Sequence, residues 1–397
     1  MAFGFSKTRY SPIAVDFGAD SLKLLQLVPG QPPQLVAAAA EVVPAEARTD
    51  AATRDAFLVD ALRRLLAAQP FKGRRTICSL PAFQTLVQHF EVPLSEGVTL
   101  DNHVQQQLRQ RFDVDPSRMV VRHFPLSGGR ARGDQMEVLC LAATREVVMR
   151  YVNIIARAKL DLVGMHSEPL SLCKAFEHVG VGVADPAKAV CYIDIGAAST
   201  KVVITQAGRI CFAKTIQAGG DQITRQLMAT RRISFDDARR ERMAQAGGGD
   251  RAQPVEAELA AVGAPVQQAG ATATGTGLPA LDAQASPVAS DSAAAAPALG
   301  ADTMECLVDE LQLSLRYHQR LCPDVPVEKL VFLGGESRDV TTCQAIARAV
   351  RVAAQLGDPL AHAARIGQRR PAHGVDLDQP QPGWAVPFGL CLSDANL

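Results

Sequence analysis

Two stretches of the chain share one pattern of hydrophobic and polar positions. Residues 13–27 read IAVDFGADSLKLLQL, and residues 191–205 read CYIDIGAASTKVVIT. In each stretch an apolar run of strand length leads into a short polar turn, and a second run rich in aliphatic residues follows. The pattern therefore predicts two β-hairpins, one early in the chain and one near its middle.

The two predicted hairpins also share residues at their turns. Both read D-x-G-A-x-S-x-K, and a single offset pairs Asp16 with Asp194, Gly18 with Gly196, Ala19 with Ala197, Ser21 with Ser199, and Lys23 with Lys201. Chance seldom places so many identities on one offset between two runs of the same strand type. We interpret the pair as an ancient duplication of one hairpin unit.

Similar elements follow each hairpin. A third strand is expected at 34–43 in the first copy and at 210–216 in the second, so each half starts with a three-stranded meander. Leucines at helical spacing predict a helix over 53–69, and 74–81 reads as a buried strand that ends at a proline.

Residues 82–167 interrupt this order and predict a small α+β subdomain inserted in the first half. The expected elements are a polar helix, a strand, a second helix and a second strand, at 98–112, 136–143, 145–158 and 160–166. A helix over 168–178 then leads toward the second hairpin.

The second half contains further helices and glycine-rich turns. Residues 217–228 place a Gly-Gly turn and Asp221 before a helix, whose N-terminus is either a phosphate contact or a plain N-cap. A helix over 303–320 is followed by VEKLVFLGGESRDV, which reads as a strand, a Gly-Gly turn and a helix. Trp384, the only tryptophan, is expected to anchor packing near the end of the chain.

Residues 247–300 differ in composition from the rest of the chain. They consist mainly of Ala, Gly, Pro, Gln, Ser and Thr, and they contain no aromatic residue. Such a segment buries too little apolar surface to offset the ordering of its backbone, which costs about 1–2 kcal/mol per residue. We expect a disordered insertion within the second half, because elements of the same α/β style resume after it.

Bulk composition excludes several classes of protein. Lys plus Arg equals Asp plus Glu at 41 each, so net charge gives no indication of binding to nucleic acid or an anionic membrane. The nine cysteines include no C-x-x-C pair, which favours free thiols in a reducing compartment. No apolar run has the length of a membrane span, and no signal peptide is evident at the N-terminus. The sequence predicts a cytoplasmic protein.

The residue types at the hairpin turns are suited to a metal-bound polyphosphate. Glycine after Asp-x lets backbone N–H groups approach an anion, and Ser21, Ser199, Thr200 and the two lysines add donors and positive charge. Asp16 and Asp194 would repel phosphate unless a cation lies between them, and Mg²⁺ prefers few carboxylates plus phosphate oxygens. A plain tight turn is the alternative for either hairpin taken alone.

Gly334 and Gly335 form a second candidate contact with a nucleotide. Between a strand and a helix they would let a base and ribose lie against the backbone, with Glu336 available for hydrogen bonds. A tight strand-to-helix turn without a ligand explains the same residues.

A D-x-G hairpin, a second D-x-G hairpin and a strand ending in Gly-Gly, in this order, resemble the actin-like ATPase superfamily. The resemblance is closest to the PilM family of type IV pilus assembly proteins, a family related to FtsA and MreB. It is carried by VDFGADSLKLLQL, SLPAFQTLVQHFEVP, EVLCLAATREVV, HSEPLSLCKAF, YIDIGAASTKVVI, GGDQITRQL, DELQLSLRYHQ, LVFLGGES and WAVPFGLCL.

The resemblance implies an α/β fold: a two-lobed actin-like ATPase with ribonuclease H-like halves and Mg-ATP between them. Asp16, Gly18, Ser21 and Lys23 match the first phosphate motif, with Asp16 and Asp194 as metal ligands. The second phosphate motif matches Asp194, Gly196, Ser199 and Thr200. The adenosine motif matches Gly334, Gly335 and Glu336, and Glu168 stands where related enzymes orient the attacking water.

One departure from the family concerns the nucleoside. The family often shows Ala-Glu-x-x-Lys after the second-half helix, whereas this chain has Ala238-Arg239-Arg240-Glu241-Arg242, without that glutamate in place. Ribose recognition is therefore expected to differ.

The expected divisions of the chain follow from these elements and motifs. They are a first half at 1–81, an inserted subdomain at 82–167, a connecting helix at 168–190, the start of a second half at 191–246, a disordered insertion at 247–300, and the rest of the second half at 301–397.

The resemblance also implies a role. PilM-like proteins bind ATP and the N-terminal tail of an inner-membrane partner, PilN, and couple it to the pilus motor ATPases, with homo-oligomers or rings as a further implication. At most slow ATP hydrolysis is expected, with no nucleic-acid partner and membrane association only through the partner. The alternatives are a small-molecule kinase of the sugar-kinase type and an FtsA-like filament-forming membrane tether.

Overall fold

The computed structural model describes residues 10–93, 99–112, 115–126, 135–177, 187–247, 303–365 and 372–395. The expected disordered insertion at 247–300 lies, apart from Gly247, outside these residues.

The first half is built on one sheet with the order β14-β3-β2-β1-β4-β8, in which β15 also pairs with β3. Strands β1, β2 and β3 form the expected antiparallel meander, and β4 and β8 continue the sheet in parallel. The strands are β1 (Ile13–Phe17), β2 (Ser21–Val28), β3 (Gln34–Val42), β4 (Arg75–Leu80), β8 (Asp161–Ser167), β14 (Ala364–Arg365) and β15 (Ala372–His373).

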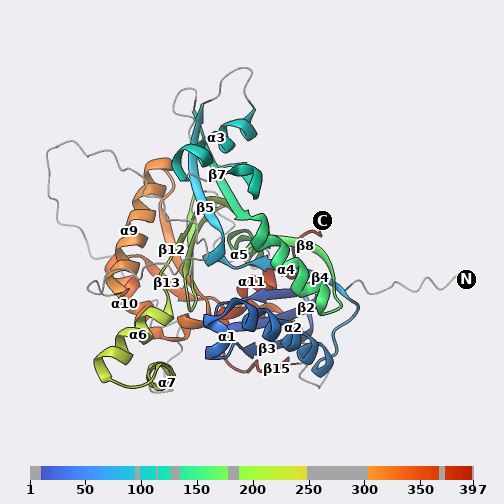
Figure 1. The fold of residues 1–397 in the computed structure, drawn as a ribbon. Helices are drawn as coiled ribbons and strands as arrows, with labels where there is room; N and C mark the ends of the chain where they lie inside the picture. The colour runs from blue at the N-terminus through green and yellow to red at the C-terminus, as the bar shows by residue number, and fades with distance from the viewer. Residues whose placement is uncertain are drawn as a thin grey trace, which may run out of the picture.

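Three helices accompany this sheet: α1 (Ala45–Thr49), α2 (Ala51–Ala68) and α4 (Arg145–Arg157) (Figure 1). Helix α2 begins directly after Asp50, whose carboxylate caps it by accepting a hydrogen bond from the Thr53 N–H. Its buried face includes Leu58, Leu62 and Leu65, which recur at helical spacing and pack into the core of the first half.

The second half repeats the arrangement of the first. Its sheet has the order β11-β10-β9-β12-β13, which corresponds strand by strand to β3-β2-β1-β4-β8. The strands are β9 (Ala189–Ile195), β10 (Thr200–Gln206), β11 (Arg209–Ile216), β12 (Val327–Leu333) and β13 (Ala353–Leu356). The helices are α6 (Gly220–Arg231), α7 (Phe235–Gly247), α9 (Thr303–Leu321) and α10 (Val340–Val350). The two hairpins thus occupy equivalent places in two sheets of one order, as the duplication predicts.

The inserted subdomain is smaller than the sequence predicted. A separate sheet of order β5-β7-β6 comprises β5 (Leu86–Pro93), β7 (Gln135–Thr144) and β6 (Met119–Pro125), with α3 (Leu100–Phe112) beside it at the top of Figure 1. Strand β8 lies in the first sheet, parallel to β4. The boundary at 167 was therefore wrong, because hydrophobic periodicity identifies a strand without showing which sheet it joins.

Two helices pack in the middle of the molecule, α5 (Glu168–Glu177) and α11 (Ala385–Cys391). They approach so closely that a Cβ on Gly389 would lie 1.8 Å from the Ser171 carbonyl oxygen. Their apolar side chains belong to a core cluster that also takes residues from both large sheets. Trp384 is part of that cluster and is 3% exposed, which confirms its role as a packing anchor.

Candidate functional site

The two hairpins have the same register at their conserved positions. Asp16 is the cross-strand partner of Lys23, and Asp194 is the partner of Lys201. Directly opposed residues of an antiparallel pair point to the same face of the sheet. The D-x-G-A-x-S-x-K spacing therefore places one carboxylate beside one ammonium group at the turn end of each hairpin.

The Asp16 carboxylate is affected by charged side chains from both halves of the molecule. Its carboxylate is 3.7 Å from Lys23 Nζ, and Ser79 Oγ, on the neighbouring strand, donates a hydrogen bond to it at 3.4 Å. Burial raises the pKa of Asp16 to about 6; Lys23 and Lys201 oppose the rise, and Glu168 and Asp194 add to it. Charges from the second hairpin thus act on the first, which places the two hairpin ends around one shared region.

Lys201 is held between two carboxylates. Its Nζ lies 2.9 Å from Asp194 Oδ1 and 3.0 Å from Glu168 Oε2, and all three side chains are buried. Burial alone would lower the pKa of Lys201, but the two carboxylates raise it above its ordinary value. The other oxygen of Glu168 accepts a hydrogen bond from the Ala82 N–H at 3.0 Å. Glu168, the candidate for orienting water, thus already has a partner for each of its oxygens.

The turns themselves retain unused backbone donors. Within the described part of the chain, the N–H groups of Ala19, Asp20 and Ala198 donate to no acceptor. The carbonyl groups of the first turn are bound instead, because Arg54 donates to Gly18 O at 2.7 Å and to Ala19 O at 3.1 Å. Both turns therefore offer N–H groups suited to an anion. No motif in the sequence includes Arg54, which lies in the first turn of α2, more than thirty residues after the hairpin turn.

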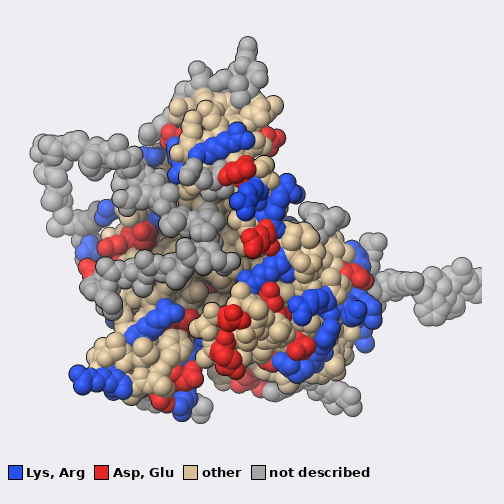
Figure 2. Space-filling view, in the orientation of Figure 1, with Lys and Arg blue, Asp and Glu red and all other residues tan. Residues whose placement is uncertain are grey.

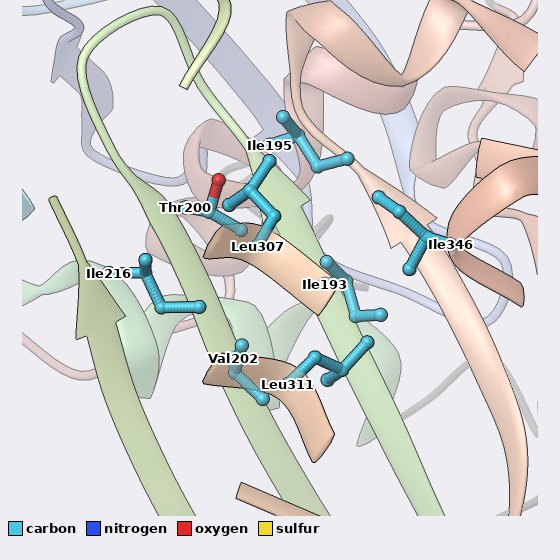
Figure 3. A pocket seen from close by; sticks show the side chains of 8 residues that line it. All are labelled: Ile193, Ile195, Thr200, Val202, Ile216, Leu307, Leu311 and Ile346. Carbon is cyan, nitrogen blue, oxygen red and sulfur yellow. The ribbon is translucent and has the colours of Figure 1, made fainter. Parts of the chain in front are cut away.

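Not every predicted hydroxyl group reaches this region. Ser21 Oγ donates to Asp20 Oδ1 at 3.1 Å, so it lies at the tip as expected. Thr200 Oγ1 donates to the Ala218 carbonyl at 2.8 Å, and the Thr200 side chain lines a small apolar cavity beneath the second sheet with Leu307 and Ile346 (Figure 3). The expectation that the Thr200 hydroxyl group faces a phosphate was wrong, because the alternation of side chains along β10 turns it inward.

The N-terminus of α6 is a cap. The N–H groups of Gly220 and Asp221 donate to the carbonyls of Gly196 and Ala197 at 3.0 and 2.8 Å. The Gly219 N–H donates to Gln222 Oε1 at 2.9 Å. These donors fasten the second hairpin turn to α6, so of the two alternatives left by the sequence the structure supports the N-cap.

The Gly-Gly turn lies beside the second hairpin because β12 is parallel to β9, with Leu333 opposite Asp194. Gly334 has φ +89° and Gly335 has open space where a Cβ would stand. Glu336 is buried, and its Oε2 lies 2.5 Å from Arg242. A Cβ on Gly220 would lie 2.1 Å from the Glu336 Cδ, so this carboxylate fills the space above that glycine.

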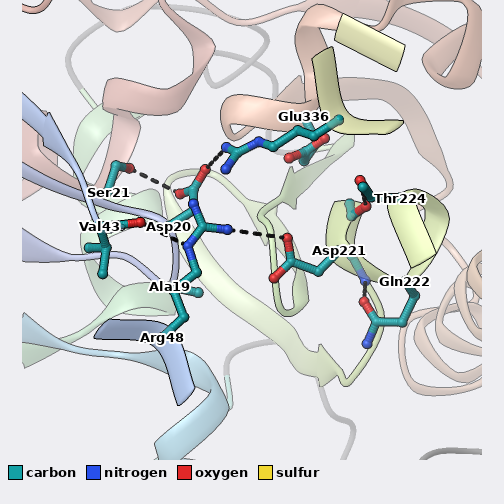
Figure 4. A network of polar contacts seen from close by, with 12 residues as sticks. Ala19, Asp20, Ser21, Val43, Arg48, Asp221, Gln222, Thr224 and Glu336 are labelled. Carbon is teal, nitrogen blue, oxygen red and sulfur yellow. Dashed lines mark hydrogen bonds and ion pairs between the residues drawn. The ribbon is translucent and has the colours of Figure 1, made fainter. Parts of the chain in front are cut away.

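A second set of charged residues joins the two halves through two ion pairs that the sequence does not predict. Arg239 Nη2 of α7 lies 2.5 Å from Asp20 Oδ2 at the first hairpin turn. Arg48 of α1 and Asp221 of α6 approach to 3.9 Å and point toward each other in Figure 4. Asp20 occupies a variable position of the first hairpin motif, and no spacing along the chain relates it to Arg239 or relates Arg48 to Asp221, so only the fold brings the pairs together.

Elsewhere on the surface the charges are mixed. On the face shown in Figure 2, basic and acidic side chains alternate across the described part of the molecule. No helix in the described part of the chain is long and apolar enough to span a bilayer. The described residues also contain no group of three or more His, Cys, Asp or Glu placed to hold a metal ion.

A family model for the type IV pilus assembly protein PilM matches residues 14–255. The chain belongs to the PilM family. Among solved structures, a PilM–PilN type IV pilus biogenesis complex superposes with a TM-score of 0.70 at 19% identity, covering 96% of this chain and 98% of that one. This likeness confirms the two-lobed actin-like fold expected for a PilM-family chain.

More distant similarity extends to the ethanolamine utilization protein EutJ from Carboxydothermus hydrogenoformans, at a TM-score of 0.45 and 14% identity over 97% of this chain and 89% of that one. A search of curated protein sequences finds no match.

Proposed function

We propose that this PilM-family chain is an ATP-binding scaffold of type IV pilus assembly that captures the N-terminal tail of a PilN-like inner-membrane protein. The observation that carries the nucleotide part is the convergence of two like hairpin ends. Each offers free N–H donors and one carboxylate, and Asp194 contributes to the raised pKa of Asp16.

The hairpin ends fit a triphosphate. The N–H groups of Ala19, Asp20 and Ala198 would bind phosphate oxygens, with the Lys23 ammonium group nearby. Asp16 and Asp194 would share Mg²⁺ with phosphate oxygens and water, and the cation would neutralise part of the phosphate charge. The raised pKa of Asp16 fits this role, because a buried carboxylate with too little positive charge around it gains from a cation.

The residues expected to contact the nucleoside are only partly available to a ligand. Gly335 leaves room beside the backbone, as base stacking against a glycine turn requires. Glu336, however, is paired with Arg242 and packed on Gly220. We infer that Gly334 and Gly335 shape the nucleoside end, while Glu336 serves it by fixing α6 and α7 in place.

Hydrolysis is expected to be slow. A carboxylate that orients water must be reached by the water and must attract its proton strongly. Glu168 is buried, and the Lys201 ammonium group and the Ala82 N–H already draw on the charge of its two oxygens. The chain would therefore act through the bound state rather than through rapid turnover.

The partner assignment is supported by the solved PilM–PilN complex that shares this fold. Binding of a peptide tail in a groove is a common mode of recognition. Capture of the tail would hold this chain near the inner membrane and couple the membrane protein to the motor ATPases. The last described helix, α11, is buried, so it offers no lipid-facing surface of the kind an FtsA-like tether needs. Assembly into homo-oligomers or rings is a further part of the proposal.

The deciding experiment measures capture of a synthetic peptide with the N-terminal sequence of the PilN-like protein from the same operon or genome, with and without Mg-ATP. A scrambled peptide controls for non-specific binding. Asp16→Ala should lower Mg-ATP affinity at least about tenfold and reduce capture with it. Asp60→Ala, an exposed substitution on α2, is the matched control. Undiminished Mg-ATP binding in Asp16→Ala would contradict the assignment of the nucleotide to the two hairpin ends.

A further inference from the structure

The lobes of this chain are joined by ion pairs at the mouth of the region assigned to the nucleotide. Arg239 of the second half reaches Asp20 of the first half at 2.5 Å, across a sequence separation of 219 residues. Arg48 and Asp221 make a second such pair at 3.9 Å (Figure 4). The first pair connects the β1–β2 turn with α7 of the other half, and the second connects α1 with α6.

Each end of the Arg239–Asp20 pair is held in position. The Asp20 carboxylate accepts a hydrogen bond from Ser21 Oγ at 3.1 Å, and the Asp20 carbonyl accepts one from the Val43 N–H at 2.8 Å. On α7, Arg242 follows Arg239 by three positions and therefore lies on the same face of the helix. Arg242 is fixed by Glu336 at 2.5 Å and by a hydrogen bond of 3.2 Å to Thr224.

The second pair is anchored in the same way. Arg48 Nε donates to the Val43 carbonyl at 2.9 Å, so its side chain is directed from α1 toward the second half. The Asp221 N–H is bound to Ala197 O of the second hairpin turn. The first pair thus engages the first hairpin turn directly, and the second reaches the second hairpin turn through the backbone of Asp221.

The guanidinium group of Arg239 lies between the two parts of the nucleotide region. It contacts Asp20, whose N–H is one of the free donors of the first turn. Burial raises the pKa of Glu336, which follows Gly335, and the Asp20 charge raises it further. The positive charges of Arg242 and Arg239 act to lower the same pKa. Arg242, three positions after Arg239 on the same face of α7, pairs with Glu336, so α7 places Arg239 beside both the first hairpin turn and the turn after Gly335.

We propose that Arg239 and Asp20 form a latch that closes the two lobes without nucleotide and that a nucleotide must displace in order to bind. The proposal rests on the nucleotide-binding role given above, because the latch would lower the affinity for a nucleotide at those same hairpin ends. Side chains of the latch are about one-fifth to one-quarter exposed, 21% for Arg239 and 24% for Asp20. A pair this accessible is of modest strength, so it can hold the lobes and still give way to a phosphate chain.

The test measures the distance between the lobes in the full chain, first without nucleotide. Spin labels are placed by Ala67→Cys on α2 and Ala229→Cys on α6, both exposed positions. The background carries Cys173→Ser and Cys306→Ser, since the other seven cysteines are buried. The latch predicts one short distance in this parent and a longer or broader distribution in Arg239→Ala.

Two further variants show whether Arg239→Ala changes the distance by removing the ion pair or by destabilising α7. Arg239→Lys keeps the charge and should retain the short distance. Arg240→Ala removes a neighbouring arginine that pairs with Asp237 on its own helix, and it should also leave the distance unchanged. An Arg239→Ala distribution identical to the parent overturns the latch.

A titration with Mg-ATP then tests whether the nucleotide competes with the Arg239–Asp20 ion pair. Arg239→Ala should bind Mg-ATP about twofold to fivefold more tightly than the parent, because no ion pair has to break first. Equal or weaker binding than the parent overturns the competition. If no variant binds Mg-ATP, the proposed nucleotide role fails, and the distances without nucleotide alone decide whether the latch exists.

Discussion

Gly334 packs its Cα directly against the backbone of Ile195, and a Cβ at Gly334 would lie 2.2 Å from the Ile195 carbonyl oxygen. The φ of +89° at Gly334 is a second reason why only glycine suits this position. Gly334→Ala should therefore lower the free energy of unfolding by about 2–4 kcal/mol. Urea unfolding followed by circular dichroism measures the change.

Gly335 supplies the matched control, because nothing lies within 4 Å of a Cβ built there. Gly335→Ala should change the free energy of unfolding by less than about 1 kcal/mol. The same variant should weaken Mg-ATP binding if a nucleoside lies against this glycine. Equal loss of stability in both variants would contradict the separate roles that the structure gives to the two glycines.

Asp16 should make the nucleotide-free protein less stable at neutral pH. Its pKa is about 6 in the folded protein against an ordinary value of 3.8, so the folded state holds the proton more tightly than the unfolded chain. The contribution of Asp16 to stability is full below about pH 4 and is lost as pH rises toward and through 6. Asp16→Asn should thus be about 1–3 kcal/mol more stable than the parent at pH 7.5.

The check is urea unfolding of both proteins at pH 7.5 and at the lowest pH where both still fold. The difference between them should shrink as the pH falls. Asp60→Asn, an exposed carboxylate on α2, should show no such trend. A stability difference that stays constant with pH would show that Asp16 does not have the raised pKa.

Lys201 should be essential for folding stability, because it neutralises two buried carboxylates. Lys201→Met leaves Asp194 and Glu168 buried without their cation, which should cost about 3–5 kcal/mol. Combining it with Glu168→Gln should recover part of the loss, because one of the unpaired charges is removed. A double variant no more stable than Lys201→Met would mean that the Glu168 ion pair adds nothing.

The contact between the inserted subdomain and the second half rests on Glu137. Burial alone would raise the pKa of Glu137, but hydrogen bonds from His89 and Tyr317 lower it below its ordinary value. Tyr317 of α9 donates its hydroxyl group to Glu137 Oε1 on β7, and His89 Nδ1 lies 3.2 Å from that oxygen.

Tyr317→Phe should lower the free energy of unfolding by about 1–2 kcal/mol at pH 7. Because the Glu137 pKa is depressed, this contribution is present above the ordinary carboxyl pKa and is lost as pH falls through the folded value. A double-mutant cycle with Glu137→Gln measures the coupling. Additive losses would show that the two side chains do not interact.

The sequence was sufficient for the parts of the fold that repeat. Two copies of one motif predicted two hairpins, and each hairpin together with its following strand was found as a meander. The same register then placed Asp16 beside Lys23 and Asp194 beside Lys201. These predictions succeeded because they depend on local alternation and on spacing within a hairpin.

Contacts made between distant segments could not be predicted in the same way. β8 was assigned to the wrong sheet, and Thr200 was expected to face the wrong side of its strand. Arg239 was noted only as a departure from a family pattern, and its pairing with Asp20 depends on how α7 lies against the first half. No spacing along the chain encodes that distance, because it arises from the packing of two lobes.

The two contacts of the Glu168 carboxylate affect how any experiment at this position can be interpreted. Its carboxylate connects the backbone after β4 with Lys201 of β10, so it fastens one sheet to the other. A reduced ATPase rate after Glu168→Ala would therefore not identify a catalytic group, because loss of alignment between the sheets would slow the reaction equally. At this residue only a substitution that preserves the mechanical connection can report on chemistry.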